Sequence, residues 1–297
     1  MSASPYTAFL PLGRRSAAAL EPEETWWHWQ GHDVHIARAR RADASARVLV
    51  VHGAGGHSGA LWPMAALLAE RGLDVAAVDL PLYGRTTSPE PGAVRYDDWV
   101  RLLLDLVDAE HDGRPLILLG ASIGGMLAYE VAARSSHVAT VAATCLLDPR
   151  DWRARAHMTR FGPVGILGGL LSTLARGRVA TAMIPMNRVA NLSKMSRNPA
   201  LSELCATDPL GGGARVPIGF LASYMKYRHA SPESMRTPVV LLHPSLDAWT
   251  PVELSMRVFR RLASPGKVVM LRECGHFPVE EPGITDLVSA VLEIAER

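Results

Sequence analysis

Three kinds of feature are scarce or missing in this 297-residue sequence, and each absence argues against a class of protein. The three cysteines, Cys145, Cys205 and Cys274, lie far apart and form no CxxC pair, which argues against a disulfide framework or a structural zinc site. No stretch reaches the roughly 18 apolar residues that a membrane helix needs. Because the first residues also lack a secretory signature, we predict a cytoplasmic protein.

An excess of one charge is lacking as well. The formal net charge is +2, so the balance of charge predicts no nucleic-acid partner. No GxGxxG fingerprint follows the first apolar strands, which argues against a dinucleotide site. What the sequence does have is a hydrophobic fraction of 48%, ordinary for a globular chain with a large core.

Short apolar runs alternate with helical patterns along most of the chain. Residues 1–24 are expected to form an arm. The predicted strands are Val34–Ala39, Val48–Val51, Val75–Val78, Leu116–Leu119, Val138–Leu147, Val239–Leu242 and Val268–Leu271. The predicted helices are Ala60–Arg71, Tyr96–Glu110, Met126–Arg134, Val252–Leu262 and Ile284–Ala295. Such alternation predicts an α/β fold, with a mostly parallel central sheet and helices on both faces.

Residues 150–235 interrupt this rhythm and show no clear strand. We predict that they form an inserted, mainly helical lid, and that residues 1–149 and 236–297 form the core. The helical candidates in the insertion are Ile166–Leu174, Pro199–Ala206 and Ile218–Tyr227. The insertion has 12 basic and 4 acidic residues, a net charge of +8, which leaves −6 on the core.

The strongest chemical signal is the pentapeptide Gly120-Ala121-Ser122-Ile123-Gly124, between a predicted strand and a predicted helix. This context is that of a nucleophile elbow, a sharp turn that exposes a strained serine. Ser122 is therefore the predicted nucleophile. The alternative is a tight turn with an inert serine.

A serine hydroxyl needs a base, and in this arrangement the chain order is serine, acid, histidine. His276 follows the last predicted strand and is the candidate base. Asp247, after the preceding strand, is the candidate acid that orients the imidazole. Asp148, at the end of an earlier strand, is the alternative acid.

Two backbone N–H groups should bind the oxyanion that forms when the serine attacks. One belongs to Ile123, directly after the nucleophile. The other is expected from Ala54, in a glycine-rich loop after the strand Val48–Val51. His52 and Gly53 of this loop are predicted to contact substrate. The alternative is a glycine-rich connecting loop without a catalytic role.

These residues resemble the α/β-hydrolase superfamily, and in particular its monoacylglycerol lipase and lysophospholipase branch. The stretch 52–59 (HGAGGHSG) is similar to the oxyanion-loop motif of that branch, and 79–86 (DLPLYGRT) to the loop after the next strand. Residues 208–210 (DPL) are similar to a lid motif of these lipases. The resemblance implies the α/β-hydrolase fold and a carboxylic ester hydrolase.

The predicted substrate is a small ester with an apolar acyl chain, and the predicted chemistry needs neither metal nor cofactor. Apolar lid residues, among them Leu170 and Met183, are expected to cover the acyl chain or else to pack the lid on the core. The basic lid is compatible with peripheral contact with an anionic lipid surface, or is a solvated face. C–C bond hydrolysis, perhydrolysis and non-catalytic binding of a small ligand are the competing functions.

Overall fold

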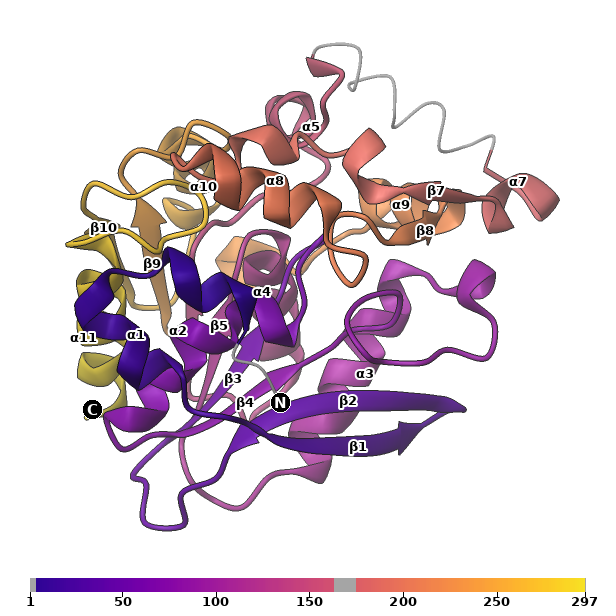
Figure 1. Ribbon diagram of the computed structural model, residues 1–297. Coiled ribbons are helices and arrows are strands. Elements are labelled where there is room, and N and C mark those ends of the chain that lie inside the picture. Colours follow the sequence, from indigo (N-terminus) through magenta and orange to yellow (C-terminus); the bar gives the residue numbers. More distant parts are fainter. Residues whose placement is uncertain (1–3, 163–174, 297) are drawn as a thin grey trace.

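The computed structural model describes residues 4–162 and 175–296 (Figure 1). Its centre is an eight-stranded sheet in the order β1-β2-β4-β3-β5-β6-β9-β10. The pairs β1–β2 and β2–β4 are antiparallel, and every other neighbouring pair is parallel. The strands are β1 Glu23–Trp29, β2 His32–Ala39, β3 Arg47–Val51, β4 Asp74–Val78, β5 Leu116–Gly120, β6 Thr140–Ala143, β9 Val239–Pro244 and β10 Gly266–Leu271.

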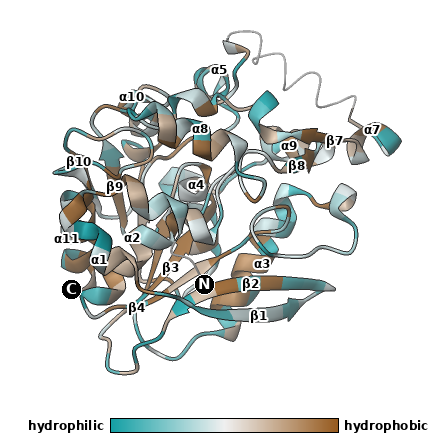
Figure 2. Cartoon of the chain, in the orientation of Figure 1, coloured by the Kyte–Doolittle hydropathy of each residue, from teal (hydrophilic) through white to brown (hydrophobic). Residues whose placement is uncertain are grey.

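Helices cover both faces of the sheet, as the alternating pattern predicted. Helices α1, α2 and α11 pack together on one face, and α3 packs against α4 on the other. Apart from Arg47 at the start of β3, the central strands β3 and β5 are apolar because neither of their faces meets water. They appear brown in Figure 2. These helices are α1 Leu12–Ala18, α2 Ser58–Glu70, α3 Tyr96–Ala109, α4 Ile123–Arg134, α10 Val252–Phe259 and α11 Gly283–Ala295.

Three points of the prediction for the core need correction. Residues 1–24 are not a loose arm, because Pro5–Phe9 forms a 3-10 helix (η1) and α1 follows it. The edge strand β1 was missed, since most of its side chains are at least partly exposed and give no apolar run. The strand predicted over Val138–Leu147 is shorter, because residues 144–147 form a buried loop that is as apolar as a strand.

The insertion 150–235 contains helices and, against the prediction, two strands. Strands β7 and β8 pair antiparallel, and each has only three residues including a proline, too few for a recognisable pattern. The predicted helix Ile166–Leu174 lies outside the described residues. The described helices and strands of the insertion lie together in the upper part of Figure 1. They are α5 Trp152–Met158, α7 Gly177–Thr181, β7 Met183–Pro185, α8 Pro199–Thr207, β8 Arg215–Pro217 and α9 Ile218–Lys226. Across residues 4–162 and 175–296, no helix is long and apolar enough to cross a membrane.

Candidate active site

The predicted catalytic and oxyanion-binding residues follow the carboxyl ends of parallel strands. In the sheet, Val51 at the end of β3 pairs with Gly120 at the end of β5, and Gly120 pairs with Ala143 of β6. The Ala121 N–H donates a hydrogen bond of 2.9 Å to the Val51 carbonyl. The loop after β3 and the turn after β5 therefore lie side by side, as ligand sites at such sheet edges require.

Ser122 sits in a strained turn between β5 and α4. Its φ of 55° and ψ of −129° are unusual for a residue with a side chain. The Ser122 N–H donates to the Thr144 hydroxyl at 2.9 Å, and the Ser122 carbonyl accepts from the Gly125 N–H at 2.8 Å. These two hydrogen bonds hold the turn on both sides, so the neighbouring residues stabilise the strained backbone of Ser122.

Close backbone contacts explain the glycines of the elbow. A Cβ on Gly120 would lie 2.3 Å from the Gly124 carbonyl oxygen, and one on Gly124 would lie 2.4 Å from that of Val51. A Cβ on Gly125 would lie 2.1 Å from the carbonyl oxygen of Cys145. Backbone atoms cannot move aside as side chains can, so the motif is required by the packing of α4 against β3 and β6.

His276 and Asp247 form a buried pair beside Ser122. The distance from His276 Nδ1 to Asp247 Oδ2 is 2.7 Å. Asp247 also accepts hydrogen bonds of 2.8 Å each from the N–H groups of Trp249 and Thr250 and from the Thr250 hydroxyl. Burial alone raises the pKa of Asp247, but His276 and the two hydrogen bonds from Thr250 outweigh it and hold the pKa at about 2. An ionised Asp247 favours the proton on Nδ1, which leaves Nε2 free to act as a base.

Asp148, the alternative acid, is placed elsewhere. Its carboxylate pairs with the Arg150 guanidinium at 2.8 Å, at the start of the insertion. The structure therefore brings Asp247 to His276 and turns Asp148 toward the insertion.

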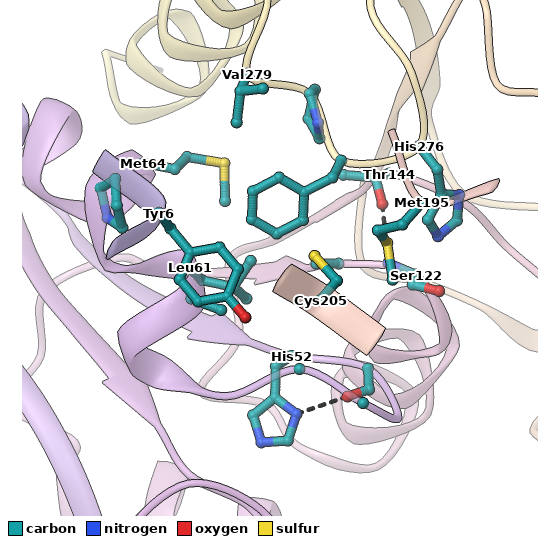
Figure 3. Close-up of a pocket in the computed structure, with 18 of the residues that line it drawn as sticks. Tyr6, His52, Leu61, Met64, Ser122, Thr144, Met195, Cys205, His276 and Val279 are labelled. Carbon is teal, nitrogen blue, oxygen red and sulfur yellow. Dashed lines mark hydrogen bonds between the residues drawn. The ribbon is translucent and has the colours of Figure 1, made fainter. Parts of the chain in front are cut away.

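The second nitrogen of the imidazole takes no part in the bond to Asp247. His276 Nε2 is buried and has no hydrogen-bond partner among the described residues. Ser122 and His276 line the same cavity (Figure 3). The indole of Trp249 packs against the imidazole with ring centroids 4.8 Å apart. Catalytic hydrogen bonds are often long or absent without substrate, so the missing partner of Nε2 does not argue against its acting as a base.

The loop after β3 is pressed against the elbow. A Cβ on Gly53 would lie 3.0 Å from the Ala121 carbonyl oxygen and 3.2 Å from the Ile123 nitrogen. His52 fixes the loop: its Nδ1 donates to the Gly53 carbonyl at 2.7 Å, and its Nε2 accepts from the Leu80 N–H at 2.9 Å. Burial, the largest effect, lowers the pKa of His52 to about 4, so the ring is neutral. His52 and Gly53 line the cavity, but both His52 nitrogens are occupied by the backbone, so its role is to position the loop.

Two apolar cavities meet at Ser122 and Ala54. The N-terminal cavity lies between η1, α2 and the loop that follows His276. The insertion-side cavity is roofed by residues of the insertion, including Met158, Met186, Phe220 and Tyr224. Of the predicted lid residues, Met183 lies in β7, where it pairs with Pro217, and Leu170 lies outside the described residues. Met183 does not line the insertion-side cavity, whereas Met186, three residues further on, does.

The motif at residues 208–210 joins three parts of the molecule. Asp208 Oδ2 lies 2.8 Å from His57 Nε2, just after the oxyanion loop, and accepts a hydrogen bond of 2.8 Å from the Tyr6 hydroxyl.

Sequence reasoning missed Tyr6, as well as Thr144 and Thr250. Hydroxyl-bearing residues are common in loops, so no pattern distinguished these. Among the described residues, no cluster of three or more His, Cys, Asp or Glu could hold a metal ion.

The sheet order, the elbow and the acid–histidine pair at the strand ends together define an α/β-hydrolase. The chain belongs to the family of serine aminopeptidase S33, whose profile matches residues 42–283. This confirms the resemblance that the motifs predicted.

Individual relatives agree with this membership. A monoacylglycerol lipase of Mycolicibacterium smegmatis is 25% identical over 75% of this chain and 77% of its own. A human monoglyceride lipase is 28% identical over 68% of this chain and 65% of its own. The solved monoacylglycerol lipase of Paleococcus ferrophilus has a TM-score of 0.66 at 22% identity, covering 88% of this chain and 98% of its own. A soluble variant of the Saccharomyces cerevisiae monoglyceride lipase, solved with a substrate analogue, has a TM-score of 0.71 at 16% identity, with 93% and 96% covered. The solved structures confirm the predicted fold, and the relatives agree with the predicted enzyme class.

Proposed function

We propose that this protein hydrolyses carboxylic esters that carry an apolar acyl chain, through the triad Ser122, His276 and Asp247. The observation that carries the proposal is the 2.7 Å contact between His276 and Asp247, beside a serine held in a strained turn. The two relatives named as lipases of monoacylglycerols support the same class of substrate.

The reaction follows from these positions. Ser122 Oγ attacks the ester carbonyl while His276 Nε2 takes the hydroxyl proton, and the ionised Asp247 stabilises the resulting imidazolium. The N–H groups of Ala54 and Ile123 bind the oxyanion of the tetrahedral intermediate. His276 then gives its proton to the leaving alcohol, and an acyl-enzyme remains. Water, deprotonated by the same histidine, attacks the acyl-enzyme and releases the acid.

The decisive experiment compares the wild type with Ser122→Ala. A fluorophosphonate probe should label only the wild type, and the variant should lose about 10⁴-fold or more in kcat toward 4-nitrophenyl esters. Circular dichroism checks that both proteins are folded. If the folded wild type neither reacts with the probe nor cleaves esters, the triad proposal is wrong. Tight binding of an ester without turnover would favour a ligand-binding protein.

Exposed apolar residues of the insertion support a second element of the proposal, contact with an anionic lipid surface. Trp152, Phe161 and Val179 are 53%, 56% and 52% exposed. Exposed arginines lie beside them in the sequence, at positions 153, 160, 176 and 178. Apolar side chains among basic ones are typical of proteins that lie on a bilayer surface.

Sedimentation with vesicles tests this contact. Binding should require anionic lipid, should fall steeply with added salt, and should weaken in Trp152→Ala. Binding that is absent, or that does not respond to salt, would contradict the contact while leaving the hydrolase proposal intact.

A further inference from the structure

The N-terminal segment, residues 4–18, precedes the part of the chain that the family profile matches, yet it reaches the catalytic cavity. Tyr6 of η1 and Leu10 directly after it line the N-terminal cavity and are only 2% and 1% exposed. In Figure 3, Tyr6 lies on one side of the pocket, and Ser122 and His276 lie on the other. The segment is thus part of the wall that a bound substrate would meet.

Tyr6 contacts three neighbours that surround the active site. Its ring centroid lies 6.0 Å from that of Phe277, the residue after the catalytic histidine, and 6.0 Å from that of His57. The Tyr6 hydroxyl donates a hydrogen bond of 2.8 Å to Asp208 of the insertion. Because burial raises the pKa of Tyr6, its hydroxyl group stays protonated and remains a donor. With the ring and the hydroxyl both held, Tyr6 is a fixed surface of the pocket.

The rest of the segment is docked on the core by polar contacts. The Ser4 hydroxyl donates to the Gly59 carbonyl at 2.7 Å, at the start of α2. The Arg14 guanidinium donates to the Thr285 hydroxyl at 2.6 Å on α11. Helix α1 also packs against α2. Because both ends of the segment are anchored, the wall has a defined position.

The chemistry of the two cavities indicates what they can hold. Beyond the proposed catalytic residues, the N-terminal cavity is lined mostly by apolar side chains, among them Leu10, Leu61, Met64 and Val279 of the core and Met195 of the insertion. The insertion-side cavity is mostly apolar as well. Each therefore suits an alkyl chain, and Ser122, common to both, lies where the two chains would join.

We propose that residues 4–18 form part of the substrate pocket, and that Tyr6 and Leu10 set the length of the chain bound on that side of Ser122. The preferred substrate then carries an apolar group on each side of the ester carbonyl. This inference rests on the proposed ester hydrolysis and adds a substrate class to it.

Two series of esters test the inference. One varies the acyl chain of 4-nitrophenyl esters from two to twelve carbons, and the other varies the alkyl alcohol of butanoate esters over the same range. Leu10→Ala removes three carbons from the wall, so its optimum for kcat/KM should move to chains about two to three carbons longer in one series only. Met186→Ala, on the insertion side, should move the optimum in the other series.

Matched controls keep the result interpretable. Leu12→Ala changes a leucine of the same segment that is 80% exposed, and should leave both profiles unchanged. The fluorophosphonate probe gives the fraction of competent enzyme in each preparation. Leu10→Val, a milder truncation, replaces Leu10→Ala if the latter does not fold.

The possible outcomes distinguish a failure of this inference from a failure of the proposed ester hydrolysis. If Leu10→Ala or Leu10→Val is fully labelled by the probe and both of its profiles coincide with those of the wild type, the N-terminal wall is refuted. An equal shift in both series would show general loosening and would refute it too. Faster cleavage of glycerol esters than of alkyl esters with the same acyl chain would contradict an apolar group on both sides. A wild type that the probe does not label would remove the hydrolase proposal itself.

Discussion

The loops at the strand ends and the two segments that close the pocket are built differently. Asp247 is held by neighbours two and three residues along the same loop, and Ser122 is held by Thr144 just after β6 and by Gly125 in the first turn of α4. The closing segments, residues 4–18 and 150–235, supply mostly apolar side chains from distant parts of the sequence. The residues of the proposed triad are held by hydrogen bonds within and between the strand-end loops, whereas the shape of the pocket rests on the packing of segments distant in the sequence. Changes in the loops should therefore lower kcat, and changes in the closing segments should alter KM and chain-length preference.

The largest effect that would sharpen this contrast is expected from Asp247→Asn. The amide favours the wrong imidazole tautomer while keeping the size of the side chain, so kcat should fall by about 10⁴-fold. Asp148→Asn is the matched control, because it changes the same residue type at the end of another strand. Since Asp148 pairs with Arg150 and not with His276, its kcat should change less than tenfold, as steady-state kinetics would show. A larger loss in Asp148→Asn than in Asp247→Asn would reverse the assignment of the acid.

A smaller loss is expected from Gly53→Ala. The added Cβ would lie 3.0 Å from the Ala121 carbonyl oxygen and 3.1 Å from the Ser122 Cβ, so the oxyanion loop must move away from the elbow. Displacing one oxyanion donor should reduce kcat by about 10²-fold with little change in KM. In the closing segment, a Cβ on Gly13 would have no neighbour within 4 Å, so Gly13→Ala should keep full activity. Equal kcat values for the two variants would show that the loop after β3 does not bind the oxyanion.

Much of the site was predictable because its signals are local. The elbow at Ser122 needs glycines at fixed offsets, and the acid and the base follow strands whose apolar runs are easy to recognise. The choice between Asp247 and Asp148 was open, because both follow strands and only a folded structure shows which carboxylate reaches His276. Local apolar patterns also predicted the central strands and their flanking helices, with small errors at the ends of these elements.

In the closing segments, helices α8 and α9 lie within one residue of the predicted Pro199–Ala206 and Ile218–Tyr227, but Tyr6 and the two short strands were missed for a physical reason. Tyr6 matters through contacts with Asp208 and Phe277, more than 200 residues away, and no local pattern encodes such pairs. Strands β7 and β8 are each three residues long and are held in place by pairing with each other. Structure that depends on long-range partners leaves little periodicity in the sequence.

The junction between the two regions should respond to Asp208→Ala mainly in stability. The substitution leaves the buried His57 and the Tyr6 hydroxyl without their shared acceptor, which should lower the free energy of unfolding by about 3 kcal/mol. Cleavage of short esters should change only a few-fold, because no triad bond is lost. Chemical denaturation of the variant and of Glu203→Ala, which removes an exposed acid from the same insertion, measures the difference. Equal stability of both variants would mean that Asp208 does not tie the insertion to the core.

The smallest effect at neutral pH concerns His52, whose protonation should be visible only in acid. Burial lowers its pKa to about 4, against an ordinary value of about 6.5 in an unfolded chain. Between these values the unfolded state binds the extra proton, so this histidine makes the free energy of unfolding fall as the pH drops from about 6.5 to 4, by up to about 3 kcal/mol.

His35 acts in the opposite direction, because Asp79 and Glu24 outweigh the effect of burial and raise its pKa. A titration of overall stability would mix the two histidines, whereas NMR of the His52 ring protons isolates one. We expect their chemical shifts to stay constant down to about pH 5, since the Leu80 N–H occupies Nε2. A midpoint near 6.5 would show that His52 is open to solvent and that the oxyanion loop is not held by it.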